Sequence, residues 1–244
     1  WRPRGFRTHY VHYQLTALTT PHWRCRVFAS LLPLSTDNIS LLHPIAGRCV
    51  FWELEPSAAH HVQNQGFSAL EKEAWLSRML LEYGPCGFNI SCGIDDTPAL
   101  ATVLFGDERN LPGVENMPTA PVTNGADVIS SLFVETGFEC LGFEQLLIDA
   151  ALTQLTRQGS RVVEAFGLRA GAFIAEDESV GWGIGTPASV GLIPETILLD
   201  AGFTVVADHD VLPRLQMTLP PPQGLLAVEE AEELIRQALT AVQT

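Results

Sequence analysis

The side chains with the most suggestive chemistry are the Asp208-His209-Asp210 triplet and Cys140, which precedes a stretch with helical spacing. An imidazole between two carboxylates could bind a metal ion or relay protons. A thiol at a helix start can have a lowered pKa and act as a nucleophile. However, adjacent residues of a hairpin point in alternating directions, and no histidine lies near Cys140 in the sequence. We therefore expect a loop at the triplet, packing at Cys140 and no metal site.

A second kind of chemistry belongs to main-chain groups. Residues 128 to 134 form an apolar stretch typical of a buried strand, and residues 141 to 158 repeat apolar positions at helical spacing until Gly159. A strand, a tight loop and a helix place N–H groups at the positive helix N-terminus, where they can bind phosphate. Residues 161 to 166 predict another buried strand, so both strands of this β-α-β unit should share one sheet.

The elements around these residues indicate a mixed α/β architecture. Ser68 and Glu71 form an S-x-x-E capping box, and the helical spacing that follows continues to Gly84. Other stretches read as extended, at residues 38–43, 49–53, 88–92 and 99–105. The last two flank the Asp95-Asp96 turn and predict a hairpin.

Composition excludes several classes of protein. The chain has 244 residues, of which 46% are hydrophobic, and its formal net charge is −14. This content can bury a sizeable core, and a surface of that sign repels phosphate backbones, so nucleic acid is not an expected partner. No run approaches the roughly 18 apolar residues that cross a bilayer, so no membrane partner is expected. The five cysteines include no C-x-x-C pair, which favours a reduced, cytoplasmic chain.

Charge and composition divide the chain into three parts. Residues 1 to 36 contain no acid, and we expect them to be a poorly ordered extension or, alternatively, a targeting segment. Residues 37 to 219 carry the α/β pattern. Residues 220 to 244 begin with three prolines and continue as an amphipathic helix that would dock on its own domain or on a partner. The glycine-rich residues 181 to 185 open no helical pattern, so a mobile loop is favoured over a dinucleotide fingerprint.

The β-α-β unit is part of a longer resemblance. The string VISSLFVETGFECLGFEQLLIDAALTQLTRQGSRVVEAFG, residues 128 to 167, resembles the acetyl-CoA-binding core of the GNAT N-acetyltransferase superfamily. Residues 195 to 219 look like its short helix and final hairpin, and residues 48 to 87 look like its acceptor-side helical region. The resemblance, to a bacterial member with a degenerate pyrophosphate loop, implies a GNAT-like mixed central sheet flanked by helices, with a short C-terminal helix.

The resemblance also implies a binding site for acetyl-CoA as co-substrate. In the family a bulged strand pairs its free main-chain groups with the pantetheine arm, and those positions fall at Leu132, Phe133 and Val134. An ordinary sheet interior is the alternative.

The family's pyrophosphate loop, Q/R-x-x-G-x-G/A, corresponds to Glu139, Cys140, Leu141, Gly142, Phe143 and Glu144. Only Gly142 matches the pattern, and Glu139 and Glu144 flank a site meant for an anion. One like-charge pair at ~5 Å and an effective dielectric of ~20 costs roughly 3 kcal/mol, unless the carboxylates point to solvent.

Acetyl transfer to an amine needs a route for the amine proton. Asp127 and Glu164 are the nearest carboxylates to the expected cleft and are the candidate catalytic bases; the alternative for each is a structural role at a strand end. The family's usual tyrosine acid is missing, because Tyr10, Tyr13 and Tyr83 all precede the short helix where it is expected.

The sequence therefore predicts an N-acetyltransferase that moves an acetyl group from the coenzyme A thioester to a small-molecule or protein amine, with a homodimer as a possible assembly. The competing prediction is a non-catalytic acyl-CoA-binding or protein-interaction module built on a degenerate form of the same fold. The two glutamates and the missing tyrosine favour the module, and the intact order of the core favours the enzyme.

Overall fold

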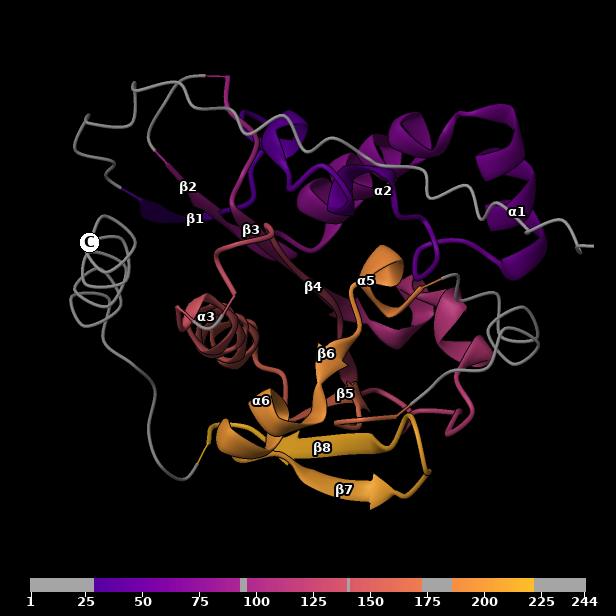
Figure 1. The fold of residues 1–244 in the computed structure, drawn as a ribbon, viewed down its shortest axis with the longest axis vertical. Helices are drawn as coiled ribbons and strands as arrows, with labels where there is room; N and C mark the ends of the chain where they lie inside the picture. Colours follow the sequence, from indigo (N-terminus) through magenta and orange to yellow (C-terminus); the bar gives the residue numbers. More distant parts are fainter. Residues whose placement is uncertain (1–28, 93–95, 140, 173–185, 222–244) are drawn as a thin grey trace, which may run out of the picture.

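The computed structural model describes residues 29–92, 96–139, 141–172 and 186–221, and within these ranges one mixed sheet organises the chain (Figure 1). Its strands run in the order β1-β2-β3-β4-β5-β8-β7, and β6 pairs with β5. Neighbouring strands are antiparallel except for the parallel pairs β4–β5 and β5–β6. The strands are β1 (Ser30–Pro33), β2 (Gly87–Ser91), β3 (Ala101–Asp107), β4 (Asp127–Val134), β5 (Val162–Leu168), β6 (Ile193–Pro194), β7 (Thr204–Ala207) and β8 (Arg214–Thr218). The predicted central mixed sheet is confirmed.

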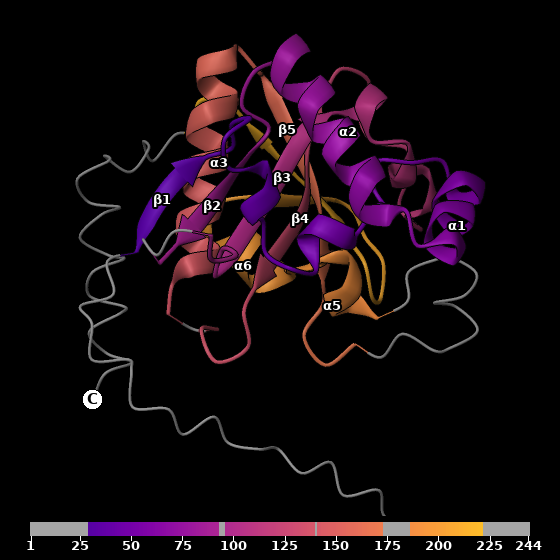
Figure 2. The same ribbon diagram turned by 90° about the horizontal axis from the view of Figure 1, so that it is seen from above.

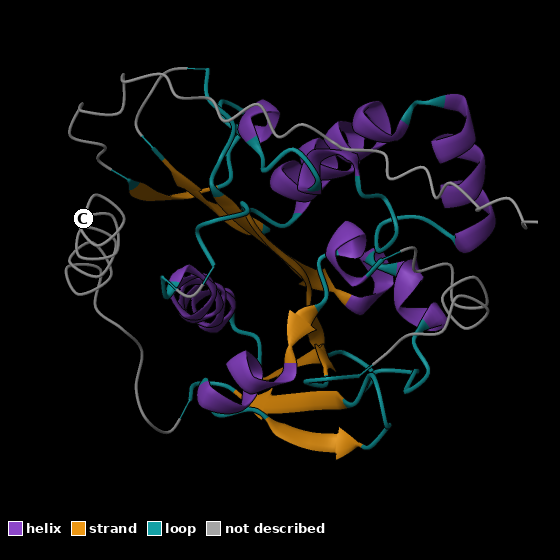
Figure 3. Ribbon diagram, viewed as in Figure 1, coloured by secondary structure: helices purple, strands orange, loops and turns teal. Residues whose placement is uncertain are grey.

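Helices cover both faces of this sheet (Figures 2 and 3). One face carries α3 (Phe143–Gln158) and α6 (Glu195–Asp200), and the other carries α1 (Pro56–Gln65), α2 (Ser68–Glu82) and α5 (Pro187–Val190). Short 3-10 helices are η1 (Ile39–Leu41), η2 (Ala46–Arg48), η3 (Glu108–Asn110) and η4 (Pro112–Asn116). None of the helices in the described ranges has the length and apolar character needed to span a bilayer.

The alternation of side chains along β4 supplies a hydrophobic core on each face. Ile129 and Leu132 pack in the cluster that includes the buried side of α3, whereas Val128 and Phe133 pack in the cluster that includes α2. Successive side chains of a strand point to opposite faces. The apolar stretch read as one buried strand therefore supports both cores.

The β-α-β unit is confirmed. Helix α3 follows Gly142 at φ 83° and ends at Gly159 at φ 88°, and β4 and β5 are adjacent parallel strands. Both glycines adopt the left-handed conformation that residues with a Cβ disfavour. The hairpin of β2 and β3 and the final hairpin of β7 and β8 are also present.

Two extended stretches were predicted wrongly. Residues 38–43 contain η1, because the Asn38 side chain accepts from the Ser35 N–H and donates to the Pro33 carbonyl, so that it replaces a strand ladder with a local turn. Residues 49–53 belong to turns held by local main-chain bonds, such as Leu54 N–H to the Val50 carbonyl.

The capping box is wrong too. Ser68 is the first residue of α2, and the N-cap residue Phe67 has no side-chain capping bond.

The sheet includes residues that precede Asp37. Strand β1 pairs with β2 from Ser30 opposite Ser91 to Pro33 opposite Phe88, and Leu34 is buried. An apolar run without acids thus supplies an edge strand. Residues 1–28, the glycine-rich residues 181–185 and the expected C-terminal helix beyond residue 221 lie outside the described residues.

The single lysine of the chain lies inside the fold. Lys72, on α2, has 1% of its surface exposed, and its Nζ lies 2.5 Å from Glu53 Oε1. The ammonium also lies 5.9 Å from the centre of the Trp75 ring. This buried ion pair ties α2 to the turn that precedes α1.

Candidate functional site

The parallel strands β4 and β5 separate part-way along their length. They pair only from Asp127 opposite Val163 to Ile129 opposite Ala165. On the other side of β4, Leu104 of β3 pairs with Ser131 and the next residue of β3 pairs with Ile129. Ser130 is therefore an extra residue, which makes a β-bulge, and a bulge bends its strand. The two strands part directly after it, and this opening is here called the splay.

Main-chain groups of β4 point into the splay. Phe133 pairs with Thr102 and the Glu135 N–H donates to the Leu100 carbonyl, so these residues face β3. Leu132, which alternates with them, directs its N–H to the opposite side, where it donates to the Gly191 carbonyl at 2.9 Å. The bulge predicted for this strand lies at Ser130, and Leu132, Phe133 and Val134 follow it along the open part.

A segment of the chain itself lies in the splay (Figure 1). Residues 190–194 contact β4 through the Gly191 carbonyl, and β6 pairs with β5 through Ile193 opposite Gly167 and Pro194 opposite Leu168. The indole Nε1 of Trp52 donates to the Val190 carbonyl at 2.7 Å. We call residues 190–194 the insert strand.

Sequence reasoning missed this segment. A usable signal is Thr186-Pro187 followed by Ser189, because Pro in the first turn after a hydroxyl N-cap is typical of a helix start. The structure forms this capping box at α5, which leads directly into the insert strand. The pairing with two distant strands has no local signature.

The loop between β4 and α3 contains the predicted phosphate-binding residues. Glu139 turns back on its own loop, because its carboxylate accepts from the Gly137 N–H at 2.6 Å. A Cβ added to Gly142 would have no atom within 4 Å, so the space beside it is open. Phe143 is buried and stacks on Phe138 with ring centres 6.2 Å apart. Leu141 is partly buried, and Cys140 lies outside the described residues.

The start of α3 can attract an anion. The first main-chain bond of the helix runs from the Leu146 N–H to the Gly142 carbonyl, so the N–H groups of Phe143, Glu144 and Gln145 have no partner within the helix. These groups and the helix dipole favour negative charge. Glu144, in the first turn, already places one carboxylate there.

Asp127 lies at the closed end of β4, away from the splay. It pairs with Val163 on one side and Asp107 on the other. Burial raises its pKa, a hydrogen bond with Ser160 lowers it and the nearby Asp107 carboxylate raises it, so that the pKa of Asp127 is raised overall. Five residues of extended strand, about 16 Å, separate it from Leu132.

Glu164 is held in a buried polar network rather than in the splay. Its side chain has no exposed surface, and its carboxylate accepts from Arg214, from Gln216 at 2.7 Å and from the Thr123 N–H at 3.2 Å. Burial alone would raise the pKa of Glu164, but these hydrogen bonds and the Arg214 charge outweigh it and the pKa is lowered. A carboxylate stabilised as an anion in this way is a weak base.

A titratable pair that the sequence did not predict lies at the open end of β4. The buried His43 ring stacks on Phe133, and its Nε2 lies 3.3 Å from Glu135 Oε2. Its Nδ1 accepts from the Ile45 N–H, which places the ring proton on Nε2. Burial lowers the pKa of His43, and the Glu135 carboxylate raises it by a smaller amount. The imidazole is therefore neutral near pH 7 and faces a carboxylate that is 46% exposed.

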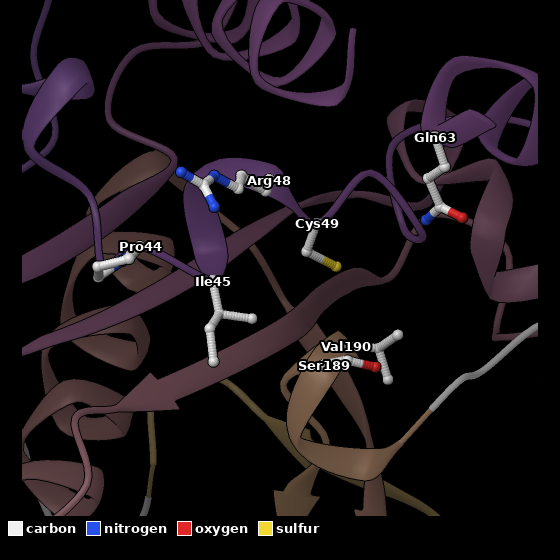
Figure 4. A pocket seen from close by; sticks show the side chains of 7 residues that line it. All are labelled: Pro44, Ile45, Arg48, Cys49, Gln63, Ser189 and Val190. Atoms are coloured by element: carbon white, nitrogen blue, oxygen red, sulfur yellow. The ribbon is translucent and has the colours of Figure 1, made fainter. Parts of the chain in front are cut away.

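A cavity of about 390 Å³ lies on the α2 face of the sheet, against the outer side of the insert strand. Figure 4 shows Ile45, Arg48 and Cys49 on one side of it and Ser189 and Val190 on the other. None of its lining residues in the described ranges is a carboxylate. Burial raises the pKa of Cys49 to about 11, so the lining thiol is neutral.

The Asp208-His209-Asp210 triplet lies in the loop between β7 and β8, as predicted. Arg169 donates to Asp208 at 2.7 Å, and His209 Nδ1 accepts from the N–H groups of Val211 and Leu212. In the part of the chain that the structure describes, no three His, Cys, Asp or Glu side chains converge as metal ligands would.

No protein-family model matches this chain, and neither does any curated protein. Solved structures do show similarity. The PaiA N-acetyltransferase of Thermoplasma acidophilum, in complex with coenzyme A, aligns at a TM-score of 0.44 with 9% identity, over 78% of this chain and 98% of its own.

Two further solved structures are similar at the same level. The ribosomal-protein-S5-alanine acetyltransferase of Vibrio fischeri aligns at a TM-score of 0.45 with 9% identity, over 79% of this chain and 94% of its own. An N-acetyltransferase of Staphylococcus aureus Mu50 aligns at 0.44 with 12% identity, over 78% and 98%.

Proposed function

We propose that this chain binds acetyl-CoA along the open part of β4 and transfers the acetyl group to an amine, as expected of a GNAT-like protein. The observation that carries the proposal is the splay, which begins at the bulge at Ser130 and leads directly into the loop and N-terminus of α3. An extended, amide-containing pantetheine can pair with an open strand edge as an added strand would. Its pyrophosphate would then reach the N–H groups at the start of α3.

The loop geometry supports this placement of the pyrophosphate. The open space beside Gly142 allows close approach of a ligand to the main chain. The Glu139 carboxylate accepts from the Gly137 N–H and so occupies a main-chain donor of the same loop. Glu144 keeps a carboxylate at the helix start, so we expect weak rather than tight binding of coenzyme A.

The described strands on either side of the splay carry no acid or base. Residues 128–134 of β4, 165–168 of β5 and the insert strand contain no titratable side chain. The amine must therefore arrive already deprotonated or lose its proton through water, and turnover should rise with pH as the acceptor deprotonates. As bases, Asp127 and Glu164 could accept the amine proton only through such water. The pair of Glu135 and His43, at the mouth of the splay, is a third candidate for the base.

The acceptor remains a small-molecule or protein amine in this proposal, and the cavity lined by Arg48 and Gln63 is its proposed position. We also propose a cytoplasmic, reduced chain, which is supported by the free, buried thiols of Cys49, Cys86 and Cys92. A homodimer is proposed at the edge strand β7, where Val205 and Val206 are exposed.

Calorimetric titration with coenzyme A and acetyl-CoA tests the proposal. Gly142→Val should weaken binding at least tenfold, because its side chain fills the space beside the loop. Gly159→Val is the matched control, since it changes a left-handed glycine with equally open surroundings at the other end of α3. Equal affinity in Gly142→Val and Gly159→Val, with both proteins folded, would contradict this location of the site.

A second candidate function is a non-catalytic acyl-CoA-binding or protein-interaction module. It is favoured by the insert strand in the splay, by Glu139 and Glu144 in the loop, and by the lack of a tyrosine after residue 83. Measurable binding of acetyl-CoA without thiol release in the presence of any amine would support this second function.

A further inference from the structure

We propose that the insert strand is an internal competitor of coenzyme A, so that the ligand binds only when residues 190–194 leave the splay. This inference rests on the proposed function. The reason is that both partners need the same main-chain donor. The Leu132 N–H, which a pantetheine amide would use, donates to the Gly191 carbonyl. A single N–H donates one strong hydrogen bond, so the Leu132 N–H cannot bond to the Gly191 carbonyl and to a pantetheine carbonyl at the same time.

The insert strand fills the splay across its whole width. Gly191 bonds to β4 on one side, and Ile193 and Pro194 pair with β5 on the other. Leu192 packs in the core cluster on the α2 face, and Ile193 packs in the cluster on the α3 face. An extended ligand between the same two strands would overlap with this segment along the sheet and on both of its faces.

Few polar contacts hold the insert strand in place. In the described part of the chain they are one main-chain bond to β4, a two-residue pairing with β5, the bond from the Trp52 indole to the Val190 carbonyl, and the bonds from the Gly191 and Leu192 N–H groups to the Pro187 carbonyl of α5. The segment follows α5, which has four residues, and it belongs to a connection rather than to the hydrogen-bonded interior of the sheet. Its release would leave the direct pairing of residues 127–129 with residues 163–165 intact. The cost of release is the exposure of Leu192 and Ile193, which are buried in the two core clusters.

Gly191 provides a point at which the segment can be released selectively. Its φ is 67°, and a Cβ there would lie 2.6 Å from the Phe133 ring. An alanine would thus be strained and would clash with a side chain of β4. Gly66, at the end of α1, has φ 76° and open surroundings, so Gly66→Ala has similar strain without the clash and is the matched control.

Trp52 provides a second, independent variant. Trp52→Phe keeps an aromatic ring in the core and removes the N–H that holds the Val190 carbonyl. Trp75→Phe is its control, because Trp75 is also buried and its indole donates to a main-chain carbonyl, that of Asn110, away from the splay.

The experiment combines coenzyme A titration with amide hydrogen exchange on the full chain. We expect Gly191→Ala and Trp52→Phe to bind coenzyme A about tenfold more tightly than the parent chain, and Gly66→Ala and Trp75→Phe to bind it as the parent does. In the parent, coenzyme A should increase exchange at Ile193, which pairs with β5, while the Leu132 amide stays protected because it changes its acceptor. The Gly191 and Leu192 amides donate to the Pro187 carbonyl of α5 and so do not report the release.

Three outcomes would overturn the inference, in different ways. Unchanged or weaker affinity in a variant whose Ile193 amide exchanges rapidly would show that the segment does not compete. Continued protection of the Ile193 amide in the presence of bound coenzyme A would show the same. If no variant binds coenzyme A, even with the segment released, the proposed function fails and the inference fails with it.

Discussion

The two ends of the β4–β5 pair differ in what joins the strands. At the closed end, residues 127–129 pair directly with residues 163–165, and Glu164 connects β5 to β8 through Arg214 and Gln216. At the open end, the hydrogen bonds of the described residues join the strands through the insert strand. The same two strands therefore serve as a framework at one end and as a site whose occupant can change at the other.

The closed end should therefore contribute mainly to folding stability, and the open end mainly to ligand binding. A buried ion pair such as that of Glu164 and Arg214 is costly to break, because either partner alone would be a buried charge. The polar contacts of the insert strand are few main-chain bonds, which a ligand can replace, whereas Leu192 and Ile193 also pack in the two cores. Mutations at the closed end should thus change unfolding, and mutations at the open end should change binding.

The largest effect is expected from Glu164→Gln, which tests the closed end. It leaves Arg214 without its buried counter-ion and should lower the free energy of unfolding by about 3–5 kcal/mol, measured in urea at pH 7. Because the pKa of Glu164 is lowered in the fold, its contribution is present above the pKa of an unfolded glutamate and is lost as the pH falls through the folded value. The difference between the two proteins should therefore shrink in acid.

The control for this prediction is Arg109→Gln, which breaks the ion pair with Asp107 at an exposed position. It should leave the urea midpoint unchanged. If Glu164→Gln unfolds like Arg109→Gln, the closed end does not depend on the buried pair.

A smaller effect is expected at the mouth of the open end. The double variant Glu139→Gln/Glu144→Gln should bind coenzyme A about tenfold more tightly at low salt, because two negative charges near the pyrophosphate are removed. The gain should shrink as ionic strength rises. Glu73→Gln/Glu82→Gln makes the same change of charge on the exposed side of α2 and should not alter affinity. Equal affinity in the two double variants would mean that Glu139 and Glu144 point away from the ligand.

The smallest effect concerns α3, which packs beside both ends. Burial raises the pKa of Asp149 to about 6, so the folded protein binds this proton more tightly than the unfolded chain does. Stability therefore falls as the pH rises from about 4 to 6. After allowance for its partial exposure, Asp149→Asn should add about 1 kcal/mol at pH 7.5 and almost nothing at pH 4, by urea unfolding. A gain of equal size at both pH values would contradict the role of the charge.

The sequence predicted those elements whose periodicity is local and strong. The apolar repeat of α3, its terminal glycines and the flanking strands were sufficient to give the β-α-β unit. The apolar strand β4 was found, and the position of its bulge followed from the family resemblance to within a few residues of Ser130. Residues 38–43 were misread because the side chain of Asn38 outweighs the extended propensity around it.

The parts of the candidate site that were missed depend on contacts between distant residues. The insert strand is defined by bonds to Leu132, Gly167 and Trp52, none of which is close to it in the sequence. The pairing of His43 with Glu135 likewise appears only once the fold stacks His43 on Phe133 of β4. Burial lowers the pKa of His43 below its ordinary value, and burial of this kind is a property of the assembled fold.

The burial of Lys72 has a practical consequence for studying acetyl transfer. It is the only lysine of this chain, so a folded molecule presents no lysine side chain that reactive thioesters or amine-directed labels could modify. Acetylation of an added amine could then be measured without a background of lysine acetylation on the folded protein itself. Conversely, a mass shift at Lys72 would mark molecules in which α2 had opened, and the rate of its appearance would time that opening.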